Sequence, residues 1–315
     1  MDKQSILNKF PVYLKVMTFG MIVLASIILV LIFGIVLAVP FFGPDVMKNL
    51  AVMSESKDPE LMAMAKYFQI VSQIGTFLVP TILFAFLDGR KIWSYLRLNV
   101  RPLFITAVLS ILAIFAAVPL INFLSDWNAQ MSLPTSLKNI ETWMREAEDQ
   151  AAVVTANFLN VTTPGGLMIN LLMIGVIPAI GEEFLFRGVL QKLFHQWTKN
   201  IHVSVILAAF LFSAIHIQFY GFIPRFMMGI MLGYVFVWSG SLWVPILIHF
   251  ANNSAAVIVS YLQATGSADN TFDTVGTGDS AIFPILMSTV LTALFLFSVF
   301  YIEKKKRNRI PFPDS

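Results

Sequence analysis

The chain has 315 residues, 57% of them hydrophobic and only 12% charged, and its mean hydropathy is +0.77. A soluble domain is about 45–50% apolar and about 25% charged, so this composition excludes a soluble globule, and it also excludes a disordered chain. It indicates an integral membrane protein. The absence of cysteine excludes disulfides, Cys-ligated zinc, iron–sulfur clusters and a cysteine nucleophile.

Eight segments are apolar over enough residues to predict membrane-spanning helices, which need about 20 residues each. In chain order they are residues 16–42, 67–87, 103–124, 166–193, 201–219, 222–239, 242–263 and 281–302. The first is too long for the apolar region of a signal peptide, which is about 7–15 residues. We therefore predict an all-α fold, a polytopic transmembrane bundle of about eight spanning helices.

The lysine and arginine residues predict the topology of these helices, because cytoplasmic loops are enriched in both. With both termini inside, the cytoplasmic segments hold 14 of the 21 and the outer segments hold 5. This distribution favours an even number of spans and explains the net charge of +3 without nucleic-acid binding. The short loops and the lack of an appended domain are typical of bacterial proteins. We expect an integral protein of a bacterial cytoplasmic membrane, with both termini cytoplasmic.

The connection 125–165 predicts an amphipathic helix on the outer side of the membrane. Apolar side chains recur there at helical spacing between charged residues: Leu137, Ile140, Trp143 and Met144. A helix lying on the membrane surface and a solvated loop helix both fit this pattern. We divide the chain into residues 1–165 with the N-terminal helices and this loop, residues 166–263 with the polar motifs, and residues 264–315 with the last helix and a basic tail.

Three smaller features concern the helix 222–239. The Ser-Gly-Ser tripeptide 239–241 predicts a tight turn that makes the flanking helices antiparallel neighbours. Gly229 and Gly233 form a GxxxG pattern, which predicts close helix packing. Arg225, near the start of the helix, is interpreted either as a side chain that reaches the membrane interface or as a gate near an internal cavity.

Ionisable residues inside the predicted spans are concentrated in the second half of the chain. Such residues are costly in a membrane and mark functional sites. Those in question, with one neighbouring carboxamide, are Glu182, Glu183, Arg187, His216, His249 and Asn253. Dispersing them in lipid would cost about 2.5–3.5 kcal/mol for each charge. We therefore expect them to converge on one internal, hydrated cavity.

The spacing of these residues predicts different roles for the two glutamates. Glu183 and Arg187 are four residues apart and predict an ion pair along the helix. Glu182 is rotated from Glu183 by about 100° around the helix, so it would face the cavity as a general base. His249 and Asn253 are one turn apart and share a helix face.

Two schemes of hydrolysis remain open at this point. In one, Glu182, His216 and His249 form a zinc site that keeps one position for water. In the other, no metal is bound: Glu182 and His216 polarise a water, while His249 and Asn253 donate to the developing oxyanion. Both schemes direct water at a carbonyl carbon, as in peptide or ester hydrolysis.

Three motifs in order resemble those of a known family: Glu182-Glu183-x-x-x-Arg187, Phe212-x-x-x-His216 and His249-x-x-x-Asn253. They resemble the signature of the CPBP family, which comprises CAAX-processing endopeptidases of the Ras-converting type and bacterial Abi proteins linked to bacteriocin self-immunity. The resemblance covers about residues 166–263 and implies an all-helical intramembrane endopeptidase. The roles that it implies are water activation by Glu182 with His216, support by Glu183 and Arg187, oxyanion or ligand binding by His249 and Asn253, and packing of the site wall by Phe212.

We therefore predict an intramembrane endopeptidase that cleaves a membrane-associated protein or peptide. Its expected partners are membrane lipids and that substrate, with no nucleic acid. The resemblance leaves a zinc and a metal-free mechanism open, and it does not identify the substrate. The alternative is a non-catalytic immunity or scaffold protein with a structural polar cluster. A transporter is disfavoured, because the first three predicted helices lack matching ionisable residues and the chain has no internal repeat.

Overall fold

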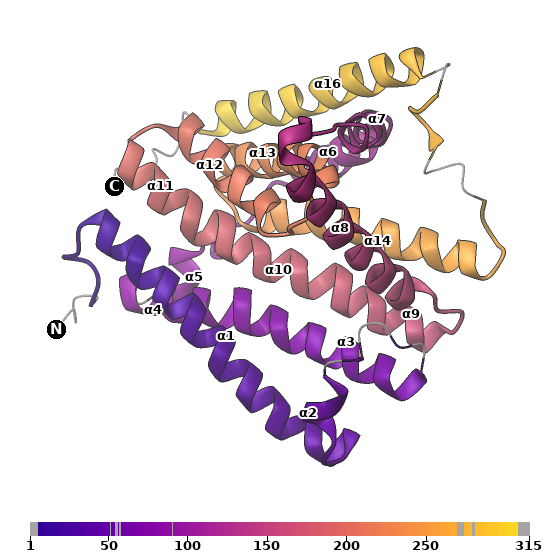
Figure 1. Cartoon of the computed structure of the whole chain (residues 1–315). Helices are drawn as coiled ribbons and strands as arrows, with labels where there is room; N and C mark the ends of the chain where they lie inside the picture. Colours follow the sequence, from indigo (N-terminus) through magenta and orange to yellow (C-terminus); the bar gives the residue numbers. More distant parts are fainter. Residues whose placement is uncertain are drawn as a thin grey trace.

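The computed structural model describes residues 6–50, 52–53, 56, 58–89, 91–269, 274–278 and 281–307. All regular elements within these residues are helices, and the long ones pack side by side into a bundle (Figure 1). The predicted all-α fold is therefore confirmed. Six rods are long and apolar enough to cross a membrane. They are α1 (Val12–Phe42), α3–η1–α4 (Pro59–Gln73, Ile74–Leu78, Val79–Gly89), α9–η3–α10–η4–α11 (Pro164–Asn170, Leu171–Val176, Ile177–Glu183, Phe184–Leu190, Gln191–Thr198), η5–α13 (Phe219–Gly221, Phe222–Ser239), α14 (Trp243–Ala264) and α16 (Ile282–Arg307).

Within the described residues, six of the predicted spans are helices long and apolar enough to cross a membrane, and a seventh is added if one bent pair is a single span. That pair is α6 (Phe104–Ala116) and α7 (Val118–Ala129), which meet at 43°. Pro119 follows the break, where its missing N–H favours a bend. Segment 201–219 is regular only over α12 (Ile201–Ala214). Its 14 residues extend about 21 Å, less than the roughly 30 Å of a bilayer core.

The bend between α6 and α7 is stabilised by the last helix. The Ser288 hydroxyl on α16 donates to the Ala116 carbonyl at 2.6 Å and accepts from the Leu120 N–H at 3.2 Å. Further along the same helices, the Thr106 hydroxyl donates to the Glu303 carboxylate at 2.7 Å, and both residues are buried. Backbone groups freed by the bend therefore find partners without water, as a membrane protein requires.

The N-terminal helices are joined to the rod α9–η3–α10–η4–α11 by buried polar contacts. Lys15 on α1 forms a 2.7 Å ion pair with Asp88 on α4. Asp88 also accepts at 3.2 Å from the hydroxyl of Tyr95, the last residue of the short helix α5 (Ile92–Tyr95). The Tyr95 carbonyl in turn accepts from the ammonium of Lys192 on α11. An apolar cluster that includes Phe84 and Phe186 fills the space between these elements.

Helices α12, α13 and α14 follow one another across the bundle with short connections. Gly240 ends α13 with a φ of 62°, the left-handed conformation that glycine adopts without strain, and α14 begins three residues later. The predicted turn is thus confirmed. A Cβ added to Gly229 would lie 3.0 Å from the Cβ of Ala209 on α12, and one on Gly233 would lie 2.8 Å from Cγ1 of Val205. The two glycines therefore allow the close packing that their spacing predicts.

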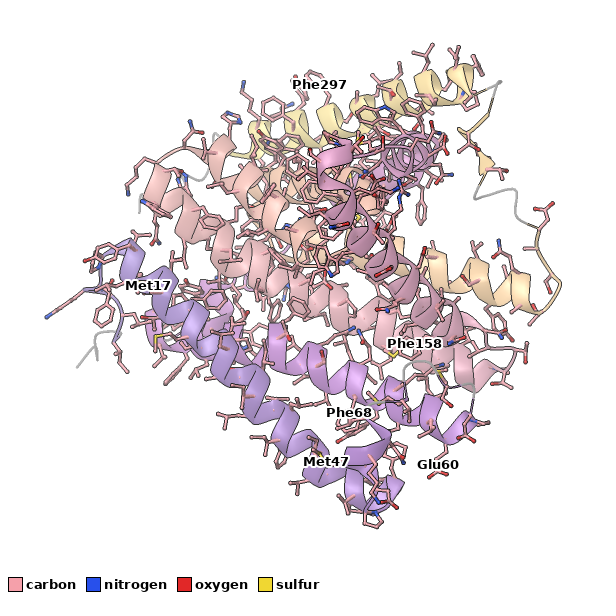
Figure 2. The ribbon with its side chains drawn as sticks, viewed as in Figure 1. Met17, Met47, Glu60, Phe68, Phe158 and Phe297 are labelled. Carbon is pink, nitrogen blue, oxygen red and sulfur yellow. The ribbon has the colours of Figure 1, made fainter. Side chains whose placement is uncertain are left out.

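The predicted helix in the outer connection is α8 (Lys138–Leu159), preceded by the turn η2 (Thr135–Leu137). It crosses the bundle and contacts α3, α14 and η5 (Figure 1). Phe158 near its end is buried beside Met173, and the Phe158 carbonyl accepts from Asn170 at 2.7 Å (Figure 2). Asn170 also accepts from the buried ammonium of Lys66 at 2.9 Å. These contacts hold the C-terminal end of α8 against α3 and α9.

The outer faces of α1 and α16 are apolar and exposed. Met17 and Phe297 point away from the bundle and are 62% and 63% exposed (Figure 2). Such broad apolar surfaces are compatible with lipid rather than water. Lys3, Lys57, Arg90 and Arg309, which contribute to the topology prediction, lie outside the described residues. The orientation in the membrane and the division at residues 165 and 263 stay predictions.

The close contact at Gly229 yields a prediction about stability. We expect Gly229→Val to lower the free energy of unfolding by about 1–3 kcal/mol, because a β-branched side chain would overlap Ala209 and force α12 and α13 apart. Gly20→Val on α1 is the matched control, since a Cβ there meets nothing within 4 Å. Thermal unfolding in detergent measures both variants. Equal effects of the two substitutions would contradict the packing role of Gly229.

Candidate active site

A buried ion pair lies at the junction of α10 and η4. Glu183 is fully buried, and its Oε1 accepts from Arg187 Nη1 at 2.7 Å, so the pair expected from the i,i+4 spacing is present. Arg187 Nη2 donates to the Gly229 carbonyl on α13 at 2.9 Å. His249 on α14 donates from Nδ1 to the same Glu183 oxygen at 2.9 Å. The ion pair therefore connects three membrane helices, α14 through Glu183 and α13 through Arg187.

Phe212 lies among all three motifs. Its side chain is buried, and the Arg187 guanidinium carbon lies 4.8 Å from the centre of its ring. The rings of His216 and His249 approach it edge-on, at centroid distances of 5.4 and 5.9 Å. Such edge-on contacts fix ring orientations. Phe212 thus sets the relative positions of Arg187 and the two imidazoles.

Glu182 points away from the ion pair and lines two cavities. The residue is only 8% exposed, and its Oε2 is buried without a hydrogen-bond partner. His249 Nε2 lies 3.9 Å from this oxygen, which is beyond hydrogen-bond distance. This oxygen of Glu182 therefore has no hydrogen bond within the described part of the protein, although the residue lines both cavities.

His216 lies just after the end of α12 and lines the same two cavities as Glu182. Its Nδ1 is 2.8 Å from the Phe212 carbonyl. Because a carbonyl only accepts, Nδ1 carries the proton of this hydrogen bond, and Nε2 is the nitrogen left for chemistry. The next residue, Ile217, has a φ of 52°. A β-branched residue in this conformation is strained, and such strain clusters at functional sites.

The loop that follows His216 is held by side chains from two other helices. Asn128 on α7 donates to the Phe219 carbonyl at 3.2 Å and accepts from the Ile223 N–H at 2.8 Å. Glu148 on α8 accepts from the Tyr220 N–H at 3.0 Å. These contacts replace the backbone bonds that the loop lacks, so they determine where His216 lies.

Arg225 also contacts this loop. Its Nη2 donates to the Gln218 carbonyl at 2.6 Å, and Gln218 lines one of the cavities beside His216. The side chain is therefore directed at the loop next to the cavity rather than away from the bundle. Of the two interpretations of Arg225 from the sequence, a position near the cavity agrees with this contact.

Asn253 lies on α14, one turn after His249, and lines one of the two cavities. Its Nδ2 donates to the Ile174 carbonyl at 3.0 Å, and its Oδ1 accepts from Asn252 at 3.2 Å. Ile174 belongs to the π-helical turn η3. The structure thus brings Glu182, His216 and Asn253 to one cavity and places Glu183 behind them.

Two cavities meet at the candidate site. The first has a volume of about 700 Å³ and is lined mainly by apolar side chains of α1, η1, η4 and α12. The second has a volume of about 970 Å³ and lies beneath α8, with more polar walls. Four residues line both cavities, namely Gln69, Gln73, Glu182 and His216. The two candidate catalytic residues are therefore at the place where an apolar and a polar space join.

The proposed zinc ligands do not match this geometry. In the described part of the chain, no group of three or more His, Asp or Glu side chains is arranged to hold a metal ion. Nδ1 of His216 and Nδ1 of His249 are both occupied by hydrogen bonds. His249 Nε2 lies 3.9 Å from Glu182 Oε2. Glu182, His216 and His249 therefore form no set of metal ligands here, and the reaction proposed below contains no step at a metal.

Gln69, Gln73 and Asn128 were not predicted as site residues. All three are neutral, so a search for ionisable groups within apolar segments passes over them. A signal is nevertheless present for the first two. Polar side chains recur at helical spacing in an otherwise apolar span, at Gln69, Ser72, Gln73 and Thr76. No comparable pattern marks Asn128.

Fold and site together define a polytopic α-helical membrane protein with a buried Glu–His centre. Residues 164–255 match the sequence model of a family described as Rce1-like, type II CAAX prenyl endopeptidase. The resemblance predicted from the three motifs is confirmed over this segment, which is Rce1-like. The uncharacterized protein YpbD of Bacillus subtilis is similar, with 32% identity over 85 residues, 26% of this chain and 40% of that protein. The chain thus matches less than half of this relative. No solved structure matches significantly.

The buried ion pair yields a second prediction. We expect Arg187→Met to lower the free energy of unfolding by about 3–5 kcal/mol, because it leaves the Glu183 carboxylate buried without its guanidinium. The double variant Glu183→Gln/Arg187→Met should recover part of this loss, since the remaining group is uncharged. A double-mutant cycle of unfolding in detergent measures the coupling. Strictly additive losses would contradict the pairing.

The loop after His216 yields a third prediction. We expect Asn128→Ala to lower the free energy of unfolding by about 1–3 kcal/mol, because the Ile223 N–H and the Phe219 carbonyl lose their partner. Hydrogen exchange of residues 215–223 should accelerate in the same variant. Asn122→Ala, which removes a carbonyl contact of the same helix with Val275, is the control and should leave this exchange unchanged. Unchanged protection of the loop in Asn128→Ala would show that the asparagine does not hold it.

Proposed function

We propose that this protein is an intramembrane endopeptidase that hydrolyses a peptide bond of a membrane-associated protein or peptide. The observation that carries the proposal is the position of Glu182 and His216 in the walls of two joined cavities. Glu182 has an unpartnered carboxylate oxygen, and His216 has Nε2 left for a hydrogen bond. The match of residues 164–255 to type II CAAX prenyl endopeptidases supports the same activity.

In the proposed reaction, Glu182 and His216 activate a water molecule between them. His216 Nε2 orients the water, and Glu182 takes its proton as the oxygen attacks the carbonyl carbon of the substrate. The negative charge that develops on the carbonyl oxygen is stabilised by hydrogen bonds from the Asn253 amide and from His249 Nε2. Glu182 then returns the proton to the leaving nitrogen. The carbon–nitrogen bond breaks, and the products are one new carboxyl terminus and one new amino terminus.

Glu183 and Arg187 contribute by position rather than by contact with the substrate. Glu183 holds Nδ1 of His249 at 2.9 Å, which directs Nε2 of the same ring toward Glu182. Arg187 holds Glu183. Preorganised donors of this kind act without reorganisation during the reaction.

The apolar cavity supports a substrate that arrives from the lipid. Leu24 on α1 lines this cavity and is also 65% exposed. We propose that an apolar part of the substrate occupies this cavity, while water and the polar product use the space beneath α8. The positive-inside distribution further supports a cytoplasmic membrane with both termini inside.

The fourth prediction concerns Glu182. We expect Glu182→Gln to lower the cleavage rate by about 10²–10⁴-fold, because an amide keeps the shape of the side chain but does not accept the proton of water. Protein N-termini in membranes of source cells are compared between the wild type and this variant. Glu303→Gln is the matched control, since Glu303 is buried in α16 and lines neither cavity.

Termini that disappear in Glu182→Gln and persist in Glu303→Gln would establish proteolysis and name the substrate. If both variants are present at wild-type levels and no terminus changes, the endopeptidase proposal fails. The polar centre would then be that of a non-catalytic immunity or scaffold protein.

A further inference from the structure

Helix α3 and the turn η1 present a stripe of neutral polar side chains to the cavities. Gln69, Ser72, Gln73 and Thr76 all line the apolar cavity, and the two glutamines also line the polar one. The spacing of three and four residues places these side chains on one helix face. They belong to the second apolar rod, which lies outside the Rce1-like segment 164–255. The stripe is thus a wall of the site that the three motifs do not include.

Gln73 is the residue of this stripe that is buried. It is 8% exposed, and its Oε1 is buried without a hydrogen-bond partner. An unsatisfied amide oxygen among apolar residues is unfavourable, so its presence requires a reason. Gln191 is also buried, and its Oε1 likewise has no hydrogen-bond partner, but its Nε2 donates to the Gly233 carbonyl and the residue lines neither cavity. Gln191 has a structural contact between helices, whereas Gln73 has no such contact and lines both cavities together with Glu182 and His216.

The chemistry of cleavage within a membrane supplies the reason. A peptide segment in lipid satisfies its backbone N–H and C=O groups within its own helix. Water reaches a scissile carbonyl only where that helix is unwound, and unwinding frees several backbone groups at once. Those groups need new partners in a place with little water. A carboxamide offers both a donor and an acceptor, so it fits the alternating groups of an extended peptide.

We propose that Gln73 is a substrate-binding residue, which pairs with the main chain of an unwound substrate segment next to the scissile bond. Gln69, one turn earlier, extends the same edge toward the cavity beneath α8. This inference rests on the proposed endopeptidase function and adds to it the form in which the substrate is bound. Hydrogen bonds to the main chain depend on the conformation of the substrate backbone and not on its side chains. They therefore select substrate segments that unwind, whatever their exact sequence.

The fifth prediction tests this role with Gln73→Met, which keeps the length of the side chain and removes both polar atoms. The probe is a synthetic peptide that spans one cleavage site found by the comparison of N-termini. We expect KM to rise about tenfold, the effect of one lost hydrogen bond to a buried group, with kcat within about twofold. Gln191→Met is the matched control and should leave KM unchanged.

Ester analogues of the same peptide keep the test independent of the folding of the variant. Each analogue replaces one backbone N–H near the scissile bond by oxygen. With the wild-type protein, we expect one position to raise KM about tenfold, because the acceptor of Gln73 loses its donor. With Gln73→Met, the same replacement should have no further effect.

The outcomes separate the two proposals. If cleavage depends on Glu182 but no ester analogue raises KM and Gln73→Met behaves as the wild type, only the role of Gln73 fails. If ester effects are equal in the wild type and Gln73→Met, another group binds the main chain and the role of Gln73 again fails. If Glu182→Gln leaves every terminus unchanged, the endopeptidase function fails, and the role of Gln73 fails with it.

Discussion

A carboxylate without water needs partners, and Glu183 is fully buried in this protein. Arg187 and His249 supply them, at 2.7 and 2.9 Å from the same oxygen. Arg187 extends the network to the Gly229 carbonyl. The rod α9–η3–α10–η4–α11, α13 and α14 must therefore meet around one buried ion pair. The position of Glu182, the neighbour of Glu183 in sequence, follows from this arrangement. Because Glu182 is rotated from Glu183 around the helix, the requirements that bury one glutamate direct the other into the cavities.

Neutral side chains position the rest of the site around this buried ion pair. Phe212 packs against Arg187 and both imidazoles, so the aromatic ring transmits the position of the ion pair to His216. Asn128 supports the loop beyond His216 from α7. The N-terminal helices close the remaining side, where Gln73 lines the same cavities as Glu182 and His216. The site is thus built from nearly the whole bundle, although its three motifs lie within one third of the chain.

Much of the fold follows from local patterns. Apolar segments of about 20 residues form helices because lipid offers no other partner for backbone groups, and each of the eight predicted segments contains a helix. The helix in segment 201–219 is shorter than predicted, because hydropathy does not show where a helix stops. The segment that contains His216 remains apolar beyond Ala214, but its backbone turns at Ile217 with a φ of 52°. The bend at Pro119 likewise depends on Ser288, which is 168 residues from Leu120.

The sequence by itself determined that the protein lies in a membrane, that its polar residues cannot face lipid, and that Glu183 pairs with Arg187. Each of these follows from composition or from spacing within one helix. Only the tertiary structure decided which residues share the cavities with Glu182. Gln73 and Asn128 are neutral side chains whose meaning depends on groups far away in the chain; the Ile223 N–H, for example, lies 95 residues from Asn128. A hydrogen bond is specific to a distance of a few tenths of an ångström, and only the packing of the helices sets that distance.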